Sequence, residues 1–158
     1  MAQIWKEIKS ISYDTCDDCI EDLKKNNYKL SLWIEDIFKI NNFNFKKYNL
    51  PIKLVRKSVK EFGFKGPTEI QDIYKEIEKS GFILVPPEIA ILCRKLYNEQ
   101  PTGEWLRFAT PLESMKDSDG VPHLPKFGKA LGFYFIETYW AYPKAIFHPH
   151  NEFVMMIK

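Results

Sequence analysis

The chain of 158 residues lacks the segments that would place it in or across a membrane. No apolar run approaches the roughly 18–20 residues that a helix needs to cross a bilayer. The initial stretch MAQIWKEIKS mixes acid and base without an apolar core, so it does not read as a secretory signal. Cysteine is scarce, and an odd count of three favours free thiols in a reducing compartment. These absences predict a cytoplasmic protein without a membrane partner.

Motifs of common enzyme chemistry are missing as well. The sequence contains no glycine-rich phosphate loop, no nucleophile elbow and no HExxH helix. Its net charge of +2 is too small to indicate a nucleic-acid partner. We therefore assign no catalytic residue, and we expect no cofactor unless the histidines discussed below bind zinc or iron.

Aromatic residues, in contrast, are abundant and make up 15% of the chain. Large rings fill a core or mark a binding surface. The hydrophobic content of 45% and the charged content of 28% are typical of a globular protein. We predict one domain spanning residues 1–158, which is long enough to bury a core without disulfides.

Apolar residues at helical spacing dominate up to about residue 100. They predict five helices, which begin at Asp14 or Thr15, at Leu30, at Pro51, at Pro67 and at Pro86. The third of these carries a stripe of Ile52, Val55, Val59 and Phe62. The stretch FILV, between the last two helices, is predicted as one short strand.

From Gly103 onward the apolar residues recur with period two. EWLRFAT and LGFYFIETYWAY read as strands, PLESMKDSDGVPHLPKFGK as a turn-rich loop, and AIF with EFVMMI as a C-terminal hairpin. The predicted fold class is therefore α+β. About five helices in residues 1–100 pack on a C-terminal antiparallel sheet of three to four strands in residues 103–158.

The strand LGFYFIETYWAY is aromatic on both sides. Its more uniformly apolar side is expected to face the core. The other side either packs under the loop 111–131, which we favour, or forms an exposed patch that binds a partner. Trp and Arg in EWLRFAT would extend such a patch, and these residue types anchor many interfaces. The candidate binding residues are Trp105, Arg107, Phe133, Phe135 and Tyr139.

The stretch FHPHNEF is the nearest approach to a metal motif. On an extended strand, His148, His150 and Glu152 would share a face and suit zinc or iron in a metal-dependent enzyme, with His123 as a further ligand. A β-turn competes with this interpretation because Pro149 fits its second position. In such a turn the imidazoles of His148 and His150 are expected to point in different directions. We favour the turn.

Three other patterns resemble functional motifs. CDDC, residues 16–19, lacks a second ligand pair for zinc and places acids beside the thiols, which favours a helix start over a redox site. DSDG, residues 117–120, misses the calcium-loop spacing and reads as a turn. Residues 50–81 fit a helix-turn-helix outline for a DNA-binding regulator, although Glu69 and Asp72 would face phosphates.

The segment IYKEIEKSGFILVPPEIAILCRKLYNEQ resembles the helix, apolar-proline link and helix of the SMI1/KNR4 immunity domains, although NEQPTG replaces their usual glycine pair. The resemblance implies an α+β protein that binds toxins. Together with the missing enzyme motifs, the aromatic strands predict a protein that binds an unknown protein partner. A metal-dependent enzyme and a DNA-binding regulator remain the alternatives.

Overall fold

The computed structural model describes residues 3–45 and 48–158, in which helices and strands alternate from the start. The helices are α1 (Cys16–Lys25), α2 (Leu32–Ile40), α3 (Ile70–Lys79) and α4 (Pro87–Leu92), with the 3₁₀ turns η1 (Lys60–Phe62) and η2 (Cys93–Leu96). The strands are β1 (Lys6–Ile8), β2 (Lys29–Leu30), β3 (Ile52–Ser58), β4 (Thr68–Glu69), β5 (Phe82–Ile83), β6 (Trp105–Phe108), β7 (His123–Ala130), β8 (Phe133–Trp140), β9 (Ile146–Phe147) and β10 (Glu152–Ile157).

Eight of these strands form one mixed sheet, and β4 and β9 form a separate pair. The order in the large sheet is β1-β3-β10-β6-β7-β8-β2, with β5 also paired to β10. Strand β10 runs parallel to β6, and β2 runs parallel to β8. The other neighbours are antiparallel. The last strand of the chain therefore lies inside the sheet, between β3 and β6.

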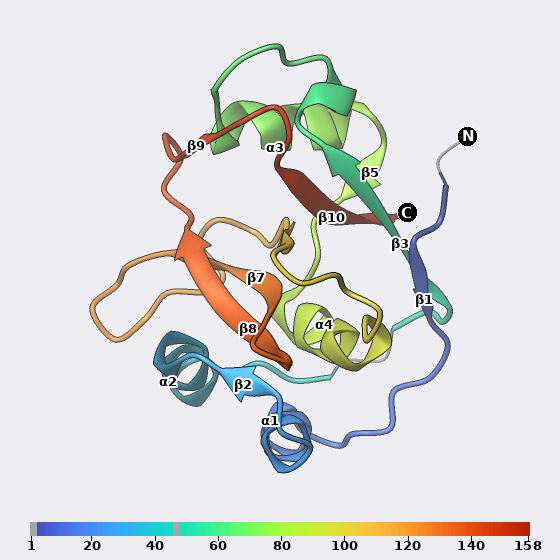
Figure 1. Cartoon of the computed structure of the whole chain (residues 1–158), viewed down its shortest axis with the longest axis vertical. Coiled ribbons are helices and arrows are strands. Elements are labelled where there is room, and N and C mark those ends of the chain that lie inside the picture. Colours follow the sequence, from blue (N-terminus) through green and yellow to red (C-terminus); the bar gives the residue numbers. More distant parts are fainter. Residues whose placement is uncertain (1–2, 46–47) are drawn as a thin grey trace.

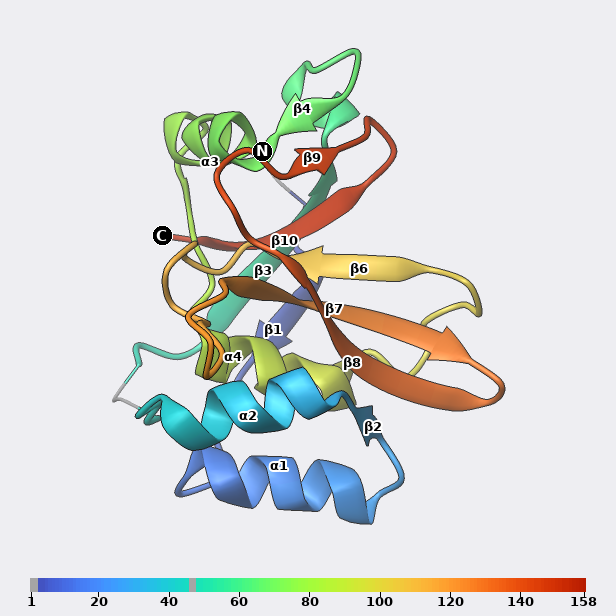
Figure 2. The ribbon, with the colours of Figure 1, turned by 90° about the vertical axis from the view of Figure 1, so that its left-hand side faces the viewer.

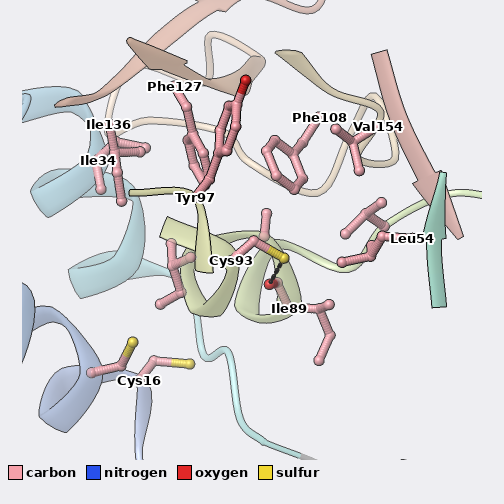
Figure 3. Packing of buried hydrophobic residues seen from close by; sticks show 14 of the residues in the cluster. Cys16, Ile34, Leu54, Ile89, Cys93, Tyr97, Phe108, Phe127, Ile136 and Val154 are labelled. Atoms are coloured by element: carbon pink, nitrogen blue, oxygen red, sulfur yellow. Dashed lines mark hydrogen bonds between the residues drawn. The ribbon is translucent and has the colours of Figure 1, made fainter. Parts of the chain in front are cut away.

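Helices cover the two faces of the large sheet unequally. Figures 1 and 2 show α1, α2 and α4 together on one side and α3 with β4 and β9 on the other. The larger apolar cluster lies under the first group and includes Phe108 and Phe127 of the sheet, Ile34 of α2 and Ile89 of α4 (Figure 3). The smaller cluster lies under α3. Both clusters share the one sheet, which makes the fold a single compact domain.

Four of the five predicted helices are present, and the starts of α1 and α2 follow the local sequence. Thr15 and Ser31 cap α1 and α2, since each hydroxyl accepts a hydrogen bond from the backbone N–H three residues later. Helix α3 buries Ile70, Ile73 and Ile77 on one face, as their spacing predicts. The predicted fifth helix is present as α4 continued by η2.

The predicted fold class is wrong, because the sheet is larger and begins much earlier in the chain. Residues 52–58 form strand β3 and not a third helix. Ile52 and Leu54 belong to the cluster under α1, α2 and α4, whereas Val55 belongs to the cluster under α3. Since both faces of β3 are buried, its apolar residues do not alternate cleanly with polar ones. The apolar residues of this strand therefore have a spacing that resembles the apolar face of a helix.

The region predicted as a loop, residues 111–131, contains the long strand β7. Pro125 and Gly128 lie inside this strand, and both residue types normally argue against one. β7 nevertheless pairs along its whole length with β8. The sheet thereby gains a central strand that the sequence pattern did not indicate.

The predicted C-terminal hairpin is also wrong. Strand β9 pairs with β4, not with β10, whose neighbours are β3, β5 and β6. Residues 148–151 therefore connect the small sheet to the large one. Across the described ranges, 3–45 and 48–158, no helix is long and apolar enough to cross a membrane.

Candidate binding face

The candidate binding residues come from neighbouring strands, and strand pairing aligns them. Trp105 of β6 pairs with Gly128 of β7, which pairs with Phe135 of β8. Since side chains alternate along a strand, these residues share the sheet face opposite the larger cluster. We call this surface the open face. Its members are Lys29, Trp105, Arg107, Lys126, Phe133, Phe135, Glu137 and Tyr139.

Helix α3 covers only part of this side of the sheet. Its apolar residues pack with those of β3, β9 and β10, such as Val55, Phe147 and Phe153. Trp105 and Phe133, in contrast, remain 38% and 42% exposed. The loop before β7 does not cover them either, because Met115 is buried in the larger cluster and Ser118 is hydrogen-bonded to Asp36 of α2.

Gly128 explains why the Trp105 indole can lie against the sheet. A Cβ atom at position 128 would stand 2.3 Å from an indole carbon of Trp105, which is far inside van der Waals contact. The ammonium group of Lys126 lies 4.7 Å from the centre of the same indole, and that of Lys29 lies 4.6 Å from the Phe133 ring. These distances are typical of cation–π contacts. The open face therefore combines flat apolar rings with positive charge.

Arg107 lies at the boundary between the open face and the part covered by α3. Its guanidinium is 5.4 Å from both the Tyr139 and the Phe147 ring centres. Burial lowers the pKa of Arg107. Its Nε is buried without an acceptor among the residues that the structure describes, and Nη1 makes one long contact of 3.5 Å with the Trp105 carbonyl.

The neighbours of Arg107 in register continue a line of charge across the sheet. Arg107 pairs with Lys126, which pairs with Glu137. Burial, and then the charge of Arg107, lower the pKa of Lys126, and burial raises the pKa of Glu137. In residues 3–45 and 48–158, neither cation comes within 4.0 Å of a carboxylate. Arg107, Lys126 and Glu137 are therefore neighbours across the sheet, but neither cation forms an ion pair with the acid.

The three predicted metal ligands are not brought together. Asn151 N donates to the His148 carbonyl at 2.9 Å, which confirms the turn. The imidazoles of His148 and His150 stack with centres 6.1 Å apart, so the expectation that the turn separates them is wrong. Glu152 instead pairs with Arg56 at 2.7 Å. No group of three or more potential ligands that could hold a metal occurs in the described residues.

His123 occupies a buried polar centre that the sequence did not reveal. Its Nε2 lies 2.8 Å from a carboxylate oxygen of Asp117, and its Nδ1 lies 3.0 Å from the Thr138 hydroxyl. Trp33 and Trp140 flank the ring, each with its centre 5.3 Å away. With the proton on Nε2, both ring nitrogens are satisfied. The only sequence signal is the acid of the DSDG turn six residues before the histidine.

This pair predicts acid sensitivity. The hydrogen bond from His123 holds the pKa of Asp117 below its ordinary value, and backbone N–H groups lower it further. The unfolded chain then takes up its proton first as pH falls. The stability that Asp117 contributes is therefore fully present above about pH 4 and is lost as pH falls through the lowered pKa. Urea unfolding of wild type and Asp117→Asn should differ near neutral pH and converge in acid. Asp119→Asn, exposed in the same loop, is the control for loss of a charge, and a constant difference at every pH would contradict the prediction.

CDDC forms the start of α1, as the sequence favours. Cys16, Cys19 and Cys93 are free and buried, and burial raises the pKa of Cys16 and of Cys19 to about 12, so both remain thiols at neutral pH. The helix-turn-helix is wrong, because β3 replaces its first helix.

Comparison with known proteins adds no assignment: no family model, curated protein or solved structure matches this chain. The resemblance to immunity domains is therefore without support from these comparisons.

Proposed function

We propose that this protein acts by binding another protein through the open face. The observation that carries the proposal is the grouping of Trp105, Phe133 and Phe135 on the part of the sheet that α3 leaves uncovered. Large aromatic rings and arginine are the residue types that anchor protein interfaces. Monomeric proteins seldom expose such a group without a binding role.

The experiment is affinity capture from lysate of the native cell, followed by mass spectrometry and a direct binding measurement with the captured protein. The double variant Trp105→Ala/Phe133→Ala should weaken that binding at least about a hundredfold, because two partly exposed anchors are removed. Its thermal unfolding midpoint should stay within a few degrees of wild type, since neither ring lies in the core.

Leu32→Ala is the matched control, because Leu32 is 82% exposed on α2 and lies outside the open face. It should bind as wild type does. Equal binding by the double variant and the wild type would exclude the open face as the interface. Unfolding of the double variant would show that these rings stabilise the fold, and the proposal would fail.

A further inference from the structure

The boundary of the open face next to α3 holds a guanidinium, that of Arg107, whose hydrogen-bonding capacity is largely unused inside the protein. Arg56, which is also partly buried, donates to Glu152 through two nitrogens and to Tyr97 and Glu104 as well. Arg107 has one long contact to a carbonyl and a buried Nε without an acceptor in the described part of the chain. Nη2 makes no hydrogen bond within the described residues and, unlike Nε, is accessible to solvent, so it can donate to a group that is supplied from outside.

The surroundings of Arg107 favour an anion as that group. Tyr139 and Phe147 pack against each other with ring centres 5.0 Å apart, and the guanidinium lies 5.4 Å from both centres, on the same side of the pair. Lys126 is the residue paired with Arg107 on the neighbouring strand. Two positive charges therefore lie close together where both side chains are partly shielded from solvent. A negative group between them would relieve the repulsion, and low solvent content strengthens its attraction to both cations.

We infer that Arg107 and Lys126 form a site for the carboxylate of an aspartate or glutamate side chain of a protein partner. The inference rests on the proposed binding role of the open face and names the group that the face recognises. Charge supports a carboxylate over a phosphate: Arg107 and Lys126 carry two positive charges and Glu137 carries one negative, which leaves one for a monoanion to neutralise. A phosphomonoester, with a charge near −2, would carry more negative charge than this single net positive charge can neutralise. The Trp105 indole supplies an apolar wall for the methylene stem of the ligand.

The test uses small probes, so it does not depend on the identity of the partner. N-acetylglutamate methylamide is titrated to about 100 mM at constant ionic strength, well above a millimolar dissociation constant, while NMR follows the side-chain N–H signals of Arg107. The probe should shift these signals saturably. N-acetylglutamine methylamide, which has the same shape without the charge, should not.

Arg107→Gln should bind the glutamate probe at least about tenfold more weakly, as followed on the backbone signals of β6 and β7, because charge-assisted hydrogen bonds are lost. Lys129→Gln is the matched control. Lys129 lies on the same strand as Lys126, but its ammonium lies 5.2 Å from the Tyr134 ring on the opposite side of the sheet. This variant should bind within about twofold of wild type, because the site keeps both cations.

Three outcomes overturn the inference: no saturable shift in wild type, equal binding by Arg107→Gln, or tighter binding of N-acetylphosphoserine methylamide than of the glutamate probe. Failure of the inference is distinguishable from failure of the proposed function. If partner binding is lost in Trp105→Ala/Phe133→Ala but kept in Arg107→Gln, the open face is an interface without this carboxylate site. If binding survives in every variant, the proposed function itself fails.

Discussion

Replacing Phe127 with alanine is expected to lower the free energy of unfolding by about 3–5 kcal/mol, because it removes a large ring from the core. Phe127 is fully buried near the middle of β7. The centre of its ring lies 4.5 Å from the ring centre of Phe108 and 4.4 Å from the guanidinium carbon of Arg94. The loss of these contacts leaves a cavity at the junction of the sheet with α4 and η2. Chemical denaturation with urea measures the effect.

Phe133→Ala is the matched control for this prediction. It removes the same side chain from β8, the strand next to β7, but Phe133 is partly exposed on the open face. Its cost should stay below about 1 kcal/mol. An effect of Phe127→Ala as small as that of Phe133→Ala would show that residues 123–130 lie at the surface, and the central position of β7 would then be wrong.

The second large effect is expected for His123→Ala, at about 2–4 kcal/mol of unfolding free energy, because the change empties a buried site and removes two hydrogen bonds. The imidazole fills the space between two indoles and joins the carboxylate of Asp117 to the hydroxyl of Thr138. Near-ultraviolet circular dichroism should change at the same time, since Trp33 and Trp140 lose the ring that separates them.

His150→Ala provides the control within the same residue type. His150 is exposed in the turn before β10 and stacks only on His148 in the described residues. Its replacement should change stability by less than about 0.5 kcal/mol. If His123→Ala were equally mild, the buried polar centre would contribute little to the fold.

The helices are the part of the fold that can be predicted from local sequence patterns. Helices α1, α2 and α3 were predicted because caps and one-sided stripes are local signals. Strand β3 resembles a helix in the sequence because apolar clusters cover both of its faces. Its order of apolar and polar residues therefore depends on elements that are distant in sequence. Strand β7 was missed because Gly128 is required by the Trp105 ring, a contact that only the fold creates.

The open face was predicted in part. Alternation along β8 correctly placed Phe133, Phe135 and Tyr139 on one side and Ile136 on the core side. Period two requires no knowledge of which strands are neighbours. Lys126 was missed because its strand was missed, and Lys29 because it reaches the face through a pairing between β2 and β8. Whether this face binds a protein stays a proposal.

The position of β10 has a consequence for how the chain folds during synthesis. Its residues pair with β3, so that Glu152 lies opposite Ser58, and also with β5 and β6. Until β10 has left the ribosome, no strand joins β3 to β6, so that β3 and β6 each expose an unpaired edge. Such long-range closure slows folding. Exposed edges also invite aggregation and chaperone binding.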